Sequence, residues 1–414
     1  MNPFEEKSKN VEDTFYNFDE LYPKSYDKDA TDPYTKTRII LMNGTEFEAI
    51  WFSHQFSRHC DNNDLRREIA VTRRIEQQQQ KRVSNLKPIN ETILETTIGY
   101  EQLAVDLTSM LAKKESNPDV KKALDFALLE DFDHLYRYAD LLEMEHHIYA
   151  DKLVGKYTEI MPGRPTIAHP RYPFDDVKRH ICNKTADPLS KLHVNIITAA
   201  EQQTMNYYMN VSCFYTTDIG RRLYQEIGMV EEEHVTQYGS LIDTNCTWLE
   251  NLLMHEYTEC YLYYSCYETE CDPNVKKIWE QHYEQEVSHL HKAAELLKKY
   301  ENKEWNQVIP DGNFPELLKL ESNIDYVRKI LETVRLTGKL EDYELVDDLP
   351  QDYEFFKYQN AIIGNVENVP SHEVIEKYIK ENGEDYRFQI EPHPIEALKC
   401  RTCDNTTIAR TKDA

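Results

Sequence analysis

One pattern of acidic residues and histidine occurs three times in this 414-residue chain, and it constrains the fold more than any other feature. In each occurrence an acidic residue is followed thirty residues later by a second acidic residue and, three residues further on, by a histidine. The composition of the chain predicts roughly 0.4 such matches by chance. The three sets are Glu101, Asp131 and His134; Glu201, Glu231 and His234; and Glu256, Glu286 and His289.

These acidic residues occupy positions that normally belong to a helix core. Leu94, Ile98 and Val105 lie seven and three residues before and four residues after Glu101, and mostly apolar residues lie at the same offsets around the other five acids. A spacing of three and four places each acid on the apolar stripe of a helix. A buried carboxylate needs a proton or a cation. The histidine three residues on lies on the same helix face, one turn away.

A helix break lies near the middle of each thirty-residue interval, at Pro118, at Asp218–Gly220 and at Pro273. Two helices joined there form an antiparallel hairpin, which brings both acids to the same height. Two such hairpins facing each other supply four carboxylates and two histidines around a pair of metal ions. Glutamate and histidine together suit iron, manganese or zinc.

A Glu on one helix and Glu-x-x-His on the next, twice over, resembles the ferritin-like superfamily, especially rubrerythrin-like di-iron carboxylate proteins. The segments 230–234 (Val-Glu-Glu-Glu-His) and 255–257 (His-Glu-Tyr) carry the resemblance. It implies a ferritin-like helical bundle, here with three hairpins rather than two, that holds two iron ions, or manganese in their place. It further implies dioxygen or peroxide as a reactant, with a small-molecule substrate or an external electron donor, and it allows for a homo-oligomer. The superfamily contains ferroxidases, peroxidases, oxygenases and manganese catalases, so the resemblance does not select one reaction.

The sequence does not settle which two hairpins share the site, but the completeness of their ligands favours the second and third hairpins over the first and second. The second and third carry the full glutamate set and are joined by a short connection at 243–247. The first and second are joined by a long proline-containing segment, about 160–188, as in bundles with a crossover connection. The first hairpin has Asp131 where the others have Glu, and the neighbouring Glu130 could substitute for it.

The remaining sequence is expected to form two flanking regions around a bundle at 90–304. Region 1–89 is predicted to hold a surface arm, a β-hairpin at 37–53 and an exposed, glutamine-rich helix at 62–86. The β-hairpin prediction rests on Asn43-Gly44 between apolar runs. Region 305–414 is expected to be a mostly helical extension with a short strand near Phe388. Within it, Cys400 and Cys403 have redox or zinc spacing but lack the second pair that an iron–sulfur centre would need.

The composition of the chain limits the cellular environments and the partners that we expect. Lys and Arg number 48 against 74 Asp and Glu, a net charge of −26, which argues against nucleic acid as a partner. There is neither a signal-peptide pattern nor an apolar stretch of membrane-spanning length, so we expect no membrane association. Nine scattered cysteines indicate reduced thiols and a cytoplasmic location.

The sequence therefore predicts an oxidoreductase that uses two bridged metal ions, most simply two iron ions. Two other classes remain: a non-enzymatic iron-binding or ferroxidase-type protein, and a metal-free helical scaffold.

Overall fold

The computed structural model describes residues 1–160, 170–331, 336–364 and 370–382. The described chain is mainly helical, with one small antiparallel sheet. It divides into two compact units, each built from segments far apart in sequence. Unit 1 consists of Met1–Glu91, Ile181–Ala200 and Ile242–Leu320, and unit 2 of Thr92–His180, Glu201–Leu241 and Glu321–Ala414.

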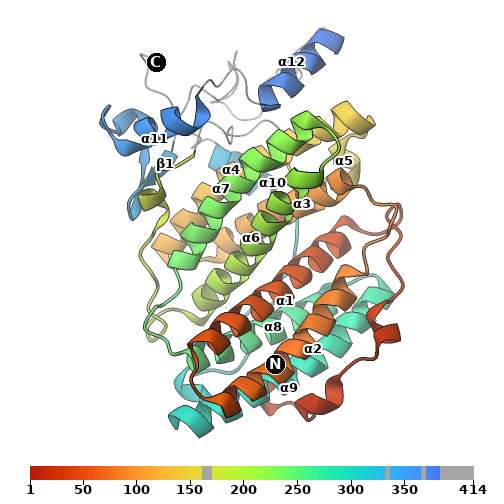
Figure 1. The fold of residues 1–414 in the computed structure, drawn as a ribbon, viewed down its shortest axis with the longest axis vertical. Coiled ribbons are helices and arrows are strands. Elements are labelled where there is room, and N and C mark those ends of the chain that lie inside the picture. Colours follow the sequence, from red (N-terminus) through yellow and green to blue (C-terminus); the bar gives the residue numbers. More distant parts are fainter. Residues whose placement is uncertain (161–169, 332–335, 365–369, 383–414) are drawn as a thin grey trace. The chain divides into compact units, whose positions relative to one another are not determined.

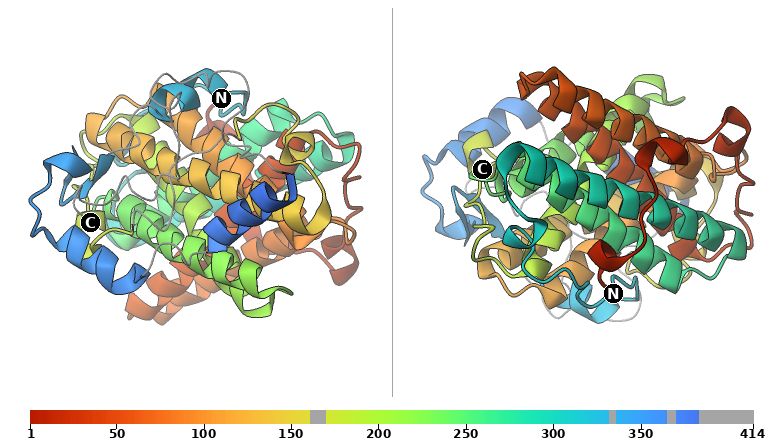
Figure 2. Two further views of the ribbon diagram at one scale, coloured as in Figure 1. Left: turned by 90° about the horizontal axis from the view of Figure 1, so that it is seen from above. Right: turned by 90° about the horizontal axis from the view of Figure 1, so that it is seen from below.

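Unit 1 is built on two helical hairpins. The first consists of α1 and α2, the second of α8 and α9; α1 packs against α8, and α2 against α9 (Figures 1 and 2). Short 3-10 turns of the N-terminal segment pack on α2 and α9, and the N-terminal part of α6 also belongs to this unit. The bounds are η1 Pro3–Glu5, η2 Val11–Thr14, η3 Phe18–Leu21, α1 Pro33–His59, α2 Asn63–Ser84, α6 Pro188–Phe214, α8 Trp248–Thr269, α9 Pro273–Glu301 and η6 Trp305–Gln307.

Unit 2 is built on the hairpin α3–α4, on α7 and on the C-terminal part of α6 from Glu201 onward. The C-terminal helix α12 packs on α4 and α7 (Figure 2). The bounds are α3 Ile93–Lys114, α4 Pro118–His146, α5 Ala150–Leu153, η5 Pro173–Asp176, α7 Asp218–Ser240, α10 Ile324–Ile330, β1 Leu336–Lys339, β2 Asp342–Leu345, η8 Val346–Asp348, α11 Glu354–Ile363 and α12 Pro370–Asn382. Strands β1 and β2 pair antiparallel with Leu336 opposite Leu345.

Helices α1 to α4 are repeated by α6 to α9 with a constant offset of 155 residues. Helices α1 and α6 both have 27 residues, α3 and α8 both 22, and α4 and α9 both 29. The start signals repeat as well. Thr92 and Thr247 form capping boxes, and an Asn or Asp N-cap precedes the first-turn prolines Pro118 and Pro273.

Each unit therefore combines two helices of the first repeat with helices of the second. In unit 1, α1 and α2 come from the first repeat and α8 and α9 from the second. In unit 2, α3 and α4 come from the first repeat, whereas α7 and the C-terminal part of α6 come from the second.

The predicted β-hairpin at 37–53 is wrong, because this segment lies inside α1. Leu41, Met42, Ala49 and Phe56 are buried along one side of that helix, and Gly44 is buried with them. Tertiary packing thus overrides the local Asn-Gly turn signal. The helix predicted at 62–86 is present as α2, but it is not simply exposed, since Glu76 and Gln79 are buried.

Further sequence predictions concern membrane spans, the cysteines and the C-terminal region. Of the described helices, none is sufficiently long and apolar to cross a membrane. The cysteines among the described residues are free thiols, as expected for reduced cysteine. The strand predicted near Phe388, and Cys400 and Cys403, lie outside the described residues.

Candidate metal centre

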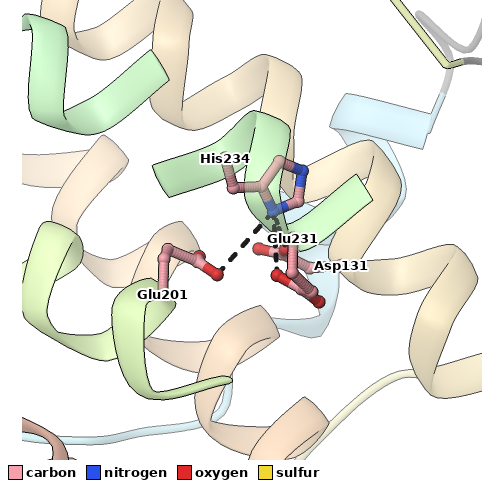
Figure 3. Close-up of side chains that lie close together, drawn as sticks. All are labelled: Asp131, Glu201, Glu231 and His234. Atoms are coloured by element: carbon pink, nitrogen blue, oxygen red, sulfur yellow. Dashed lines mark ion pairs between the residues drawn. The ribbon is translucent and has the colours of Figure 1, made fainter. Parts of the chain in front are cut away.

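Unit 2 gathers the acids and histidines of the first and second predicted hairpins. They lie near the middle of α3, α4, α6 and α7 and are at most 1% exposed. Two groups of side chains lie close enough to hold an ion: Asp131, Glu201, Glu231 and His234 in one, and Glu101, His134 and Glu231 in the other. The four residues of the first group converge in Figure 3.

Glu231 belongs to both groups and lies between the two histidines. Its Oε1 is 2.8 Å from Nδ1 of His134, and its Oε2 is 3.2 Å from Nδ1 of His234. Nδ1 of His234 also lies 3.4 Å from Asp131 Oδ1 and 3.7 Å from Glu201 Oε2. Glu231 therefore contacts one histidine from each of the two groups.

A second layer of polar groups orients the candidate ligands. Nε2 of His234 lies 2.9 Å from Glu130, which accepts a 2.6 Å hydrogen bond from the fully buried Arg171. This contact turns Nδ1 of His234 toward the carboxylates. Glu130 therefore supports His234 rather than replacing Asp131 in the described groups. The hydroxyl of Tyr208 donates a hydrogen bond to Glu101.

The cluster carries more negative charge than its protein surroundings compensate. Burial, together with the charges of neighbouring carboxylates, raises the pKa of Glu101 and Glu201 well above the usual range. Burial also raises the pKa of Asp131 to about 7. For Glu231 burial acts in the same direction, but the two histidines outweigh it and hold its pKa well below normal.

Several buried ligand atoms of this cluster have no hydrogen-bond partner among the residues that the structure describes. They are Glu101 Oε2, Asp131 Oδ1, both carboxylate oxygens of Glu201, Glu231 Oε2, His134 Nε2 and His234 Nδ1. Unpaired buried oxygens are costly unless a cation or a proton neutralises them. Carboxylates and imidazoles together are suitable ligands for iron or manganese ions. The residues present therefore fit a site for two such ions.

The third predicted hairpin lies in unit 1, where it meets residues that sequence reasoning missed. Glu256, Glu286 and His289 are accompanied by Glu46 and Glu76 from α1 and α2, and all five are at most 3% exposed. Glu46 and Glu76 are thirty residues apart, and Gln79 follows three residues later. The same spacing with Gln in place of His was thus the signal available in the sequence. The structure therefore does not bring all nine predicted ligands together, but places six in unit 2 and three in unit 1.

Comparison of the chain with protein-family models, curated proteins and solved structures gave no match. The function is therefore inferred from the geometry of the two clusters.

Proposed function

We propose that unit 2 binds two iron ions, or two manganese ions, and acts as an oxidoreductase toward dioxygen or peroxide. The single observation that carries the proposal is the position of Glu231, shared by two buried ligand groups and in contact with a histidine of each. The arrangement of an acid on one helix and an acid with histidine on the next, twice over, also supports it, because di-metal carboxylate bundles use these ligands.

Some of these side chains would bind the ions directly, and others orient the side chains that do. Glu101 and His134 would hold one ion and Asp131, Glu201 and His234 the other, with Glu231 available to both. Bound metals would supply Lewis acidity and electrons toward the oxidant. An anionic, oxygen-rich shell stabilises the higher oxidation state of such ions, because it favours added positive charge.

The surrounding protein keeps water away and fixes the ligand geometry. Leu128, Leu135 and Ile227 are fully buried within one helical turn of Asp131 and Glu231. Glu130, which is paired with Arg171, orients His234, and the hydroxyl of Tyr208 donates a hydrogen bond to Glu101. The resulting site has oriented donors and little solvent, which would suit redox chemistry of bound ions.

The test compares Glu231→Gln with Glu232→Gln, a neighbouring substitution on the exposed face of α7. After reconstitution with iron under anaerobic conditions, Glu231→Gln should hold about two fewer ions per chain than Glu232→Gln, because both ions lose the shared ligand. Reduced wild type and Glu232→Gln should change their metal absorption within seconds of stopped-flow mixing with dioxygen or hydrogen peroxide. Equal metal content in the two variants would remove Glu231 as a ligand. An iron-loaded wild type that reacts with neither oxidant would end the redox proposal.

A further inference from the structure

Unit 1 contains a second buried cluster whose residues correspond to those of unit 2 at the 155-residue offset. Glu76, Glu256 and His289 form a group of potential ligands, and they correspond to Glu231, Glu101 and His134. Nδ1 of His289 lies 3.1 Å from Glu286 and 3.8 Å from Glu256. One complete ligand group of the unit 2 type is therefore present in unit 1 as well.

The other half of the unit 1 cluster differs from unit 2. Gln79 stands where unit 2 has His234, and its side-chain amide donates a hydrogen bond to Glu286. Unit 1 has in addition Glu259, where unit 2 has Ala104. Glu259 forms a third group with Glu256 and Glu286, made of carboxylates alone. One nitrogen ligand is thus lost and one carboxylate gained.

The carboxylate of Glu259 is buried beside those of Glu256 and Glu286. It is 1% exposed, and neither of its carboxylate oxygens has a hydrogen-bond partner. Among the described residues, Glu256 Oε2, Glu46 Oε2 and His289 Nε2 are likewise buried without a hydrogen-bond partner. Such a concentration of unpaired buried oxygens points to a cation among them.

A small pocket in unit 1 borders this cluster. Its lining includes Glu76, Glu256 and His289 at one side and apolar groups such as Phe52 and Leu252 elsewhere. The space that a water molecule can occupy in it is about 10 Å³, which is room for roughly one water molecule. This space suits an ion or a diatomic molecule and is too small for a large organic substrate.

We propose that unit 1 holds a second metal centre with a more oxygen-rich ligand set than unit 2. Glu76, Glu256 and His289 hold one ion, and Glu256, Glu259 and Glu286 hold another in an all-carboxylate position. Carboxylate ligands without nitrogen favour hard divalent cations such as Mn²⁺, Mg²⁺ and Ca²⁺. This inference concerns ligands other than those of the proposed oxidoreductase site and does not depend on it.

The test uses the full chain with unit 2 disabled by the double substitution Glu231→Gln and His234→Ala. Mn²⁺ is titrated in, and free Mn²⁺ is measured from its six-line electron paramagnetic resonance signal. We expect this background to bind two Mn²⁺ ions per chain. Adding Glu259→Gln should remove one of them, whereas adding Glu268→Gln, an exposed position on the same helix, should remove none. Gln79→His should increase the affinity of the background for Zn²⁺ at least tenfold, because it restores a nitrogen ligand.

The outcomes separate this inference from the proposed function. A folded background, verified by circular dichroism, that binds no Mn²⁺ would overturn the second centre even if wild type binds two ions in unit 2. Unchanged binding in Glu259→Gln would overturn the all-carboxylate position. Binding of two Mn²⁺ by both wild type and the background would instead retain unit 1 and remove the ions from unit 2.

Discussion

Asp131→Asn should change the stability of the metal-free and the metal-loaded protein in opposite directions. In the metal-free protein burial raises the pKa of Asp131 from 3.8 to about 7. Between these pH values the folded state keeps a proton that the unfolded chain releases. The free energy of unfolding therefore falls as the pH rises through this window, and the loss is complete above pH 7.

The magnitude follows from the size of this pKa change. At about 1.4 kcal/mol for each pH unit, a rise from 3.8 to about 7 corresponds to about 4 kcal/mol lost by pH 8. Asn cannot ionise, so the variant avoids that loss. It has a weaker acceptor for the 3.2 Å hydrogen bond from Thr108, which costs about 1 kcal/mol. The net expectation is metal-free protein that is about 3 kcal/mol more stable than wild type at pH 8 and about 1 kcal/mol less stable at pH 4.

Urea unfolding of chelator-treated protein, followed by circular dichroism at both pH values, measures this difference. Asp119→Asn is the matched control, since Asp119 is exposed on the same helix. It should change stability by no more than about 1 kcal/mol at either pH. With metal bound, Asp131→Asn should instead lower stability and metal affinity, because it removes a ligand. A variant that is less stable than wild type at pH 8 without metal would refute the idea that the cluster is short of positive charge.

Two further predictions concern the groups that support the ligands in unit 2. Arg171→Met should lower the free energy of unfolding by about 3–5 kcal/mol in urea titrations, because Glu130, Asp176 and Glu233 lose their shared buried cation. Arg179→Met, which removes an exposed pair with Glu341, should cost less than about 1 kcal/mol, and equal losses in the two variants would contradict the role of Arg171. Tyr208→Phe should weaken binding of one unit 2 ion by about 10–100-fold in Mn²⁺ titrations, because Glu101 loses its orienting hydroxyl. Tyr207→Phe, which removes a hydroxyl that donates a hydrogen bond to the backbone oxygen of Ile93, serves as the control.

The helical hairpins could be predicted from sequence because their signals are local and periodic. The pairs α3–α4, α6–α7 and α8–α9 follow from acids on apolar stripes and from breaks at Pro118, Asp218–Gly220 and Pro273. The pairing of hairpins in space depends instead on contacts between distant segments. The short connection after α7 suggested that α7 and α8 belong to one bundle, yet α8 packs on α9 and α1.

The sequence does not predict the fourth hairpin, α1–α2, because its local residue patterns favour other structures. Asn43-Gly44 and the β-branched Ile39 and Ile40 favour a strand and turn, although buried residues recur at helical spacing through α1. Gln79 lies within the run Gln77–Gln80, which has the composition of a solvated surface, yet its side chain is fully buried. The set Glu46, Glu76 and Gln79 ends in glutamine, so the pattern of two acids and a histidine does not include it.

The interleaving of the repeats has a consequence for the order in which the protein forms during synthesis. Helices α3, α4, α6 and α7 leave the ribosome as one run, so the ligands of unit 2 are all present by residue 241. Helices α1 and α2 emerge before them, but their partners α8 and α9 begin more than 160 residues after Ser84. During that delay Glu46 and Glu76 lack their partners, and the apolar side of the hairpin is open to chaperones. The two hairpins of unit 1 can therefore pair only after α9 has been made, although α1 and α2 precede every helix of unit 2 in the sequence.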